Sequence, residues 1–82
     1  MNNIIGLRQM NVNQSGYIHH LSSHGELGRR LRDMGLTPGT EITIKGRAPL
    51  KDPVALRVRD CILTLRNNEA DYILVNIGER DV

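Results

Sequence analysis

The stretch that decides the fold runs from residue 23 to residue 45 and reads SHGELGRRLRDMGLTPGTEITIK. Its first half predicts a helix, because Ser23 and Glu26 have the three-residue spacing of a capping box. Gly28 in the middle of this helix predicts a close approach of the helix to a sheet, since Gly is otherwise unfavourable there. The apolar residues that follow share one helical face and predict packing against a core: Leu27, Leu31 and Met34.

A glycine is expected to end this helix, and a Pro-Gly turn to separate it from a strand. Gly35 suits the left-handed conformation that commonly follows the last helical residue, with Leu36 behind it contacting the last turn. The sequence Thr37-Pro38-Gly39-Thr40 has Pro and Gly in the order that a type II turn favours. Residues 41–45 then alternate, which predicts a strand with two residues facing inward, Ile42 and Ile44.

The rest of the chain predicts further short strands around this unit. Residues 4–12 have helical or turn-like spacing, and Asp60 is expected to form a tight reversal between two strands. The expected strands are residues 17–21, 41–45, a strand around Leu56 and Val58, residues 61–66 and residues 73–77. We therefore expect a mainly β fold, because about five short strands that bury one face close most simply into a small barrel. One helix is inserted after the first strand.

Composition limits the classes of function. The 82 residues carry 11 basic and 9 acidic side chains, for a net charge of +2, which is too weak a balance to indicate nucleic-acid binding. No apolar run approaches the roughly 18 residues of a membrane span, and no signal peptide is visible, so membrane insertion is not expected. Because Cys61 is the only cysteine, a reducing, cytoplasmic location is expected.

The sequence offers no catalytic set, and we expect a binding module and not an enzyme. Cys61 is predicted to lie in a strand on the face of Leu63 and Leu65, as a buried, inert residue. The acidic residues Asp52 and Glu69 are interpreted as turn formers or helix caps, because no pair of carboxylates stands out.

Three histidines lie close together in the sequence, at His19, His20 and His24. Imidazole nitrogens bind transition metals, but the spacing is poor for a site. In a strand His19 and His20 point to opposite faces, and His24 follows across a turn. We predict no specific metal site and no cofactor, with these three as the candidates if one exists.

Three stretches, taken in order, resemble the FeoA family of small cytosolic accessory proteins of bacterial ferrous iron transport. They are residues 29–40, residues 48–53 with the strand that follows, and residues 65–77. The resemblance implies that residues 1–82 form one SH3-like barrel. It also implies a role in supporting a FeoB-type iron permease through contact with its cytosolic GTP-binding part. The family carries a transition-metal-binding label by descent.

Four residues are the candidates for contact with such a permease. They lie on the loop of residues 46–53 and on the basic outer face of the helix: Arg29, Arg30, Leu50 and Lys51. Two alternatives stay open. An SH3-like domain of an iron-responsive regulator would need an attached DNA-binding region, against which the starting Met1 argues. A small metal carrier would use the histidines. Association of two copies through an exposed sheet edge also stays open.

Overall fold

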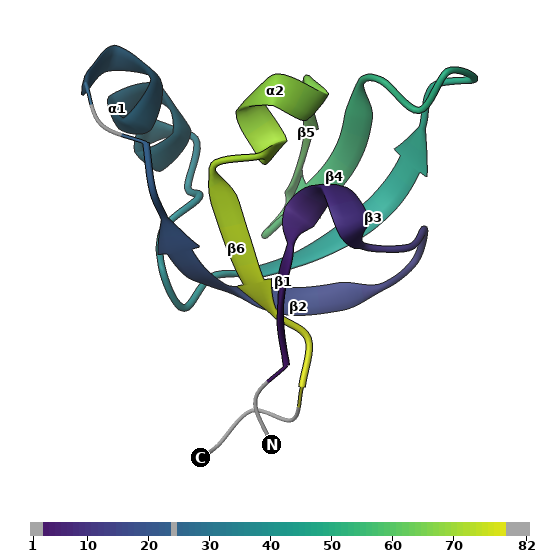
Figure 1. The fold of residues 1–82 in the computed structure, drawn as a ribbon, viewed down its shortest axis with the longest axis horizontal. Helices are drawn as coiled ribbons and strands as arrows, with labels where there is room; N and C mark the ends of the chain where they lie inside the picture. The colour runs from purple at the N-terminus through teal and green to yellow at the C-terminus, as the bar shows by residue number, and fades with distance from the viewer. Residues whose placement is uncertain (1–2, 24, 79–82) are drawn as a thin grey trace.

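The computed structural model describes residues 3–23 and 25–78, and its strands form one bent antiparallel sheet (Figure 1). The elements in chain order are β1 (Ile4–Gly6), the 3-10 turn η1 (Leu7–Gln9), β2 (Ser15–Leu21), α1 (Gly25–Asp33), β3 (Glu41–Arg47), β4 (Val54–Val58), β5 (Cys61–Leu65), α2 (Asn67–Ala70) and β6 (Ile73–Asn76). The strand order is β1-β6-β2-β3-β4-β5. The expected mainly β class with a helix inserted between strands is confirmed.

The sheet has one strand more than the five expected from the sequence. The helical or turn-like spacing of residues 4–12 does not extend to their first three residues, which form β1 and pair with β6 from Ile4↔Asn76 to Gly6↔Leu74. A three-residue strand is too short to show a period-two alternation, and the buried Leu7 and Met10 beyond it do have helical spacing. The inserted helix α1 therefore follows the second strand of the chain.

The core lies inside the curve of the sheet and is almost entirely aliphatic. Ile42 and Ile44 of β3 are fully buried, as the alternation of residues 41–45 predicts. Each side chain of this kind stabilises the fold by roughly 1.5–3 kcal/mol on burial. The fully or almost fully buried residues are Leu7, Met10, Ile18, Leu21, Leu31, Leu36, Ile42, Ile44, Val54, Leu56, Val58, Leu65, Ala70, Ile73 and Val75.

The end of α1 has the hydrogen bonds that its sequence predicts. The Leu36 N–H donates to the Leu31 carbonyl at 3.1 Å, and the Gly35 N–H donates to the Arg32 carbonyl at 2.9 Å. Gly35 has a φ of +94°, which glycine adopts without steric cost. The Pro-Gly turn closes with a 3.1 Å bond from Thr40 N–H to the Thr37 carbonyl. This pair of turns directs the chain from α1 into β3.

The beginning of α1 differs from the expectation in two ways. The helix starts at Gly25, so the position directly before it is residue 24, which lies outside the described residues, and Ser23 is buried one residue earlier. Gly28 faces the backbone of Ser23 and not the sheet. A Cβ atom placed on Gly28 would fall well inside 3.0 Å of the Ser23 carbonyl oxygen. The glycine therefore allows the helix to fold back onto the segment that leads into it.

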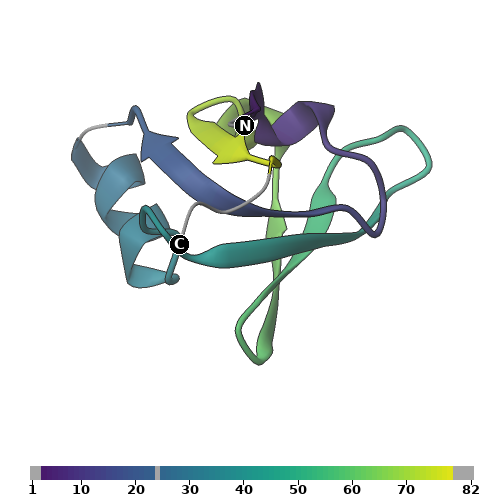
Figure 2. The same ribbon diagram turned by 90° about the horizontal axis from the view of Figure 1, so that it is seen from below.

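The hairpin of β4 and β5 projects from the rest of the molecule (Figure 2). Val58 pairs with Cys61, so only Arg59 and Asp60 form the turn, as the reversal at Asp60 predicts. The prediction of a buried Cys61 is wrong, because its side chain is exposed. β5 is an edge strand of the sheet, and its two residues next to the turn, Cys61 and Ile62, are both exposed.

Candidate partner-binding surface

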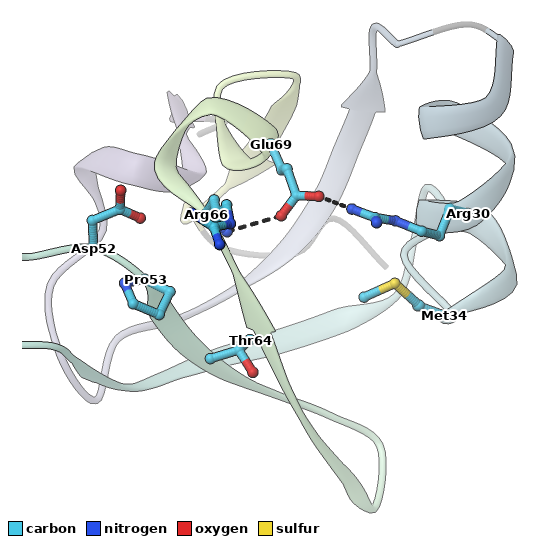
Figure 3. Close-up of a pocket in the computed structure, with 7 residues that line it drawn as sticks. All are labelled: Arg30, Met34, Asp52, Pro53, Thr64, Arg66 and Glu69. Atoms are coloured by element: carbon cyan, nitrogen blue, oxygen red, sulfur yellow. Dashed lines mark hydrogen bonds and ion pairs between the residues drawn. The ribbon is translucent and has the colours of Figure 1, made fainter.

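One side of the molecule carries both helices and the loop of residues 48–53 (top of Figure 1), and we call it the upper face. Two hollows open on it. The first, of about 540 Å³, lies between α1 on one side and the end of the loop on the other (Figure 3). Its lining combines apolar and charged side chains: Arg30, Met34, Asp52, Pro53, Thr64, Arg66 and Glu69.

An ion pair connects α1 to α2 across the first hollow. The Arg30 guanidinium contacts one carboxylate oxygen of Glu69, and the other oxygen accepts the Arg66 N–H at 2.9 Å (Figure 3). The Arg30 side chain is 59% exposed, whereas that of Glu69 is only 17% exposed. Glu69 thus acts as the helix cap predicted from the sequence and also fixes Arg30 in place. Arg30 forms one wall of the hollow and is not a free cation.

We expect the Glu69→Gln substitution to lower the free energy of unfolding by about 0.5–1 kcal/mol relative to the wild type. The glutamine side-chain oxygen keeps the cap on the Arg66 N–H, so the loss reports mainly on the ion pair with Arg30. Urea unfolding at low and high salt measures it. Because the Arg30 side of the pair is open to solvent, salt screens the attraction, so the difference should shrink at high salt. A salt-independent loss would contradict an electrostatic origin.

The second hollow, of about 630 Å³, lies on the other side of the loop, against η1 and the residues after it. The Leu50 side chain, 90% exposed, and the exposed Val12 contribute apolar surface to it. Three cationic residues line it, Arg8, Arg47 and Lys51. Within residues 3–23 and 25–78 no ion pair joins Lys51 to an acidic group. The second hollow thus combines exposed aliphatic side chains with positive charge.

The two arginines of the second hollow already have partners that fix their positions. Arg47 donates through Nη2 to the carbonyl oxygens of Arg8 and Met10, at 2.8 and 2.9 Å. Arg8 forms an exposed ion pair with Asp71 at 3.2 Å. These contacts connect the end of β3 to η1. Of the three cations that line the second hollow, Lys51 is the one whose side chain has no acidic partner within residues 3–23 and 25–78.

Hydrogen bonds to Asn67, the first residue of α2, anchor the loop that carries Leu50. The Asn67 N–H donates to Asp52 Oδ1 at 2.9 Å, and its side-chain Nδ2 donates to the Lys51 carbonyl at 3.1 Å. Asp52 therefore caps α2, as predicted for it. Both bonds fix the part of the loop that leads into β4, and Leu50 lies just before this part with its side chain exposed to solvent.

The four candidate contact residues fall in three places on the upper face. Arg30 lines the first hollow, Leu50 and Lys51 line the second, and Arg29 is exposed on α1 without lining either. Sequence reasoning missed most of the other lining residues. Glu69 has a signal in its capping spacing after Arg66, whereas Arg8 and Arg47 come from distant segments that nothing in the sequence alone brings together.

The histidines do not lie as the sequence predicted. His19 and His20 are both exposed, because an irregularity in the pairing of β2 with β6 between Ile18 and His20 breaks the alternation. His24 lies outside the described residues. Among residues 3–23 and 25–78 no three His, Cys, Asp or Glu side chains are placed to hold a metal ion together. Likewise, no helix of this part of the chain has the length and apolarity to cross a membrane.

Solved structures of similar shape place this bent sheet with its inserted helix among small bacterial SH3-like domains. A FeoA from Stenotrophomonas maltophilia complexed with zinc, described as an SH3 domain protein, is 24% identical with a TM-score of 0.74, over 92% of this chain and 88% of that one. A FeoA-like protein from Clostridium acetobutylicum is 36% identical with a TM-score of 0.85, over 100% of this chain and 95% of that one.

Sequence comparison gives the family. The FeoA domain model matches residues 5–77, and the chain belongs to the FeoA domain family, whose members are non-catalytic accessory proteins of ferrous iron transport. A relative from Porphyromonas gingivalis, a fusion of Fe(2+) transport protein A with the Fe(2+) transporter FeoB, is 31% identical over 71 residues. The match covers 87% of this chain but only 8% of the fusion protein.

A manganese-dependent transcriptional repressor also has this fold, with a TM-score of 0.84 over 95% of this chain and 44% of that one. Its sequence is only 13% identical, so the likeness shows the shared fold alone. The family match indicates the same family as the resemblance seen in residues 29–40, 48–53 and 65–77.

Proposed function

We propose that this chain acts on the cytoplasmic side of the membrane as an adaptor, which binds the cytosolic GTP-binding part of a FeoB-type ferrous iron permease. The observation that carries the proposal is the Porphyromonas gingivalis relative, in which the matching region is joined to FeoB in one protein. Domains joined in one chain stay at a high local concentration, which favours direct contact between them.

The upper face supplies the chemistry for such a contact. Leu50 is an aliphatic side chain held almost fully in water, and Lys51 beside it is a cation without an acidic partner in the described chain. Interfaces gain most from apolar side chains that become fully buried, with charges at the rim that steer association. The surface therefore suits a partner that presents an apolar recess bordered by acidic groups. Arg29, exposed on α1, adds positive charge to this side, and Arg30 contributes the wall of the first hollow while paired with Glu69.

A binding titration tests this proposal. The purified chain is titrated by calorimetry into the cytosolic part of its cognate permease, without nucleotide, with GDP and with a non-hydrolysable GTP analogue. We expect saturable one-to-one binding in at least one nucleotide state, weakened by salt because Lys51 and the helix arginines contribute. Absence of binding in all three states, together with normal ferrous iron uptake in a strain that lacks the gene, would refute the adaptor role.

A further inference from the structure

β5 is an edge strand: within residues 3–23 and 25–78 it pairs on one side only, with β4. In a hairpin closed by a two-residue turn, the pair next to the turn is hydrogen bonded, and hydrogen-bonded pairs then alternate. Cys61, Leu63 and Leu65 therefore direct their backbone groups toward β4. The N–H and C=O groups of Ile62 and Thr64 point away from the sheet, into the open.

This edge lacks the features that usually protect one. Edge strands are commonly shielded by lysines, prolines or bulges, yet residues 61–65 read CILTL, with no charge, no proline and an unbroken register with β4. The Ile62 side chain is 59% exposed, and Thr64 is exposed as well. The end of β5 that leads into α2 borders the first hollow, whose lining includes Thr64 and Arg66.

Opposite charges flank the uncharged strand at equal distances from its centre. Asp60 precedes Leu63 by three residues, and Arg66 follows it by three. Neither side chain has an ion-pair partner within residues 3–23 and 25–78. If the strand meets an inverted copy of itself centred on Leu63, Asp60 of each copy lies opposite Arg66 of the other. The charges of this edge are therefore complementary to those of the same edge in a second, inverted copy of the chain.

We propose that two copies of this chain associate through β5, antiparallel and centred on Leu63, to form a two-fold symmetric dimer. Ile62 of each copy faces Thr64 of the other, and these two residue pairs exchange four backbone hydrogen bonds. The two Asp60–Arg66 pairs set the register at the ends. The arrangement closes on itself, because each copy uses its single free β5 edge. The contact is small, so it forms at high local concentration.

Sedimentation equilibrium of the full chain over a wide concentration range tests the dimer. We expect the wild type to dimerise reversibly, and the Asp60→Arg and Arg66→Asp variants to do so about ten-fold more weakly, since each places like charges opposite one another twice. Both positions are exposed, and Asp is a favourable residue before α2, so neither change threatens folding. Lys45→Asp is the matched control, because Lys45 is exposed and carries the same charge on β3, two strands away from the edge.

Mixing the two charge variants gives the decisive arm of the experiment. In the mixed dimer, the new arginine at position 60 of the first variant would face the new aspartate at position 66 of the second. The unchanged Asp60 of the second variant would face the unchanged Arg66 of the first, so both pairs become attractive again. We expect the equimolar mixture to dimerise about as tightly as the wild type. A wild type that stays monomeric, or a mixture no better than either variant alone, would overturn the proposal.

Amide hydrogen exchange separates this dimer from other uses of the edge. The N–H groups of Ile62 and Thr64 should gain protection as the protein concentration rises, whereas that of Leu63, already bonded to β4, should not. Protection that appears only when the permease fragment is added would mean that the edge receives a strand of that partner instead, and would contradict self-association. The proposed dimer does not depend on the adaptor role, because every measurement except the addition of the permease fragment uses this chain alone.

Discussion

Replacing Gly28 by Ala should lower the free energy of unfolding by about 1–3 kcal/mol, the range expected for forcing an atom into a closely packed site. In an ordinary helix the same change raises stability by about 1 kcal/mol, because Ala is the better helix former. Here the added Cβ would meet the Ser23 carbonyl, which is backbone and cannot rotate away. Either α1 or the segment before it must shift.

Urea denaturation of the two proteins, followed by circular dichroism, measures this difference. Gly46→Ala is the matched control, since a Cβ at Gly46 meets nothing within 4 Å and its φ is not in the left-handed region. We expect the control to be neutral or slightly more stable than the wild type. If Gly28→Ala were equally neutral, the close approach of α1 to Ser23 would be wrong.

The second large effect is expected in partner binding, from changes at the tip of the loop that Asn67 anchors. Leu50→Ala should weaken binding of the permease fragment about thirty-fold, as loss of a central apolar anchor does. Lys51→Glu should weaken it about ten-fold, mainly through slower association, because the charge that steers the encounter is reversed. Neither change should alter stability by more than about 0.5 kcal/mol, since both side chains are exposed.

Two other exposed residues provide controls for these variants. Arg59→Glu reverses the same charge at a residue that also has a positive φ, +57° against +66° at Lys51, but at the tip of the other hairpin. Ile4→Ala trims an exposed aliphatic side chain on β1. Both should bind as the wild type does. Equal losses in the control and test variants would show that the loop is not the contact.

Much of this fold follows from local sequence signals. Gly35 and the Pro38-Gly39 pair specify backbone conformations that few other residues adopt, so the end of α1 and the turn into β3 were predictable from sequence. Alternation specified which side chains of β3 face inward, because a strand with one buried face requires it. The cap made by Glu69 was also predictable, since its spacing from Arg66 is a local property.

Features that depend on tertiary contacts were not predictable in this way. Cys61 has an apolar pattern on its strand face, but its exposure depends on β5 being the outermost strand. His19 and His20 are both exposed because β2 pairs irregularly with β6, and the sequence of β2 alone does not predict this irregularity. The first hollow joins α1 to the loop that follows β3, a later segment of the chain. Such sites appear only when the segments are placed in space.

The most direct test of the adaptor role is to follow the permease titration through the backbone amide resonances of the isotope-labelled chain. We expect the shifts to concentrate on the upper face, in the loop of residues 48–53, in α1 and at the start of α2. Amides at the start of β1 and at the end of β6, which pair at Ile4↔Asn76 on the side of the chain termini (bottom of Figure 1), should stay unchanged. Shifts confined to β1 and β6, or none at saturating permease, would contradict the account.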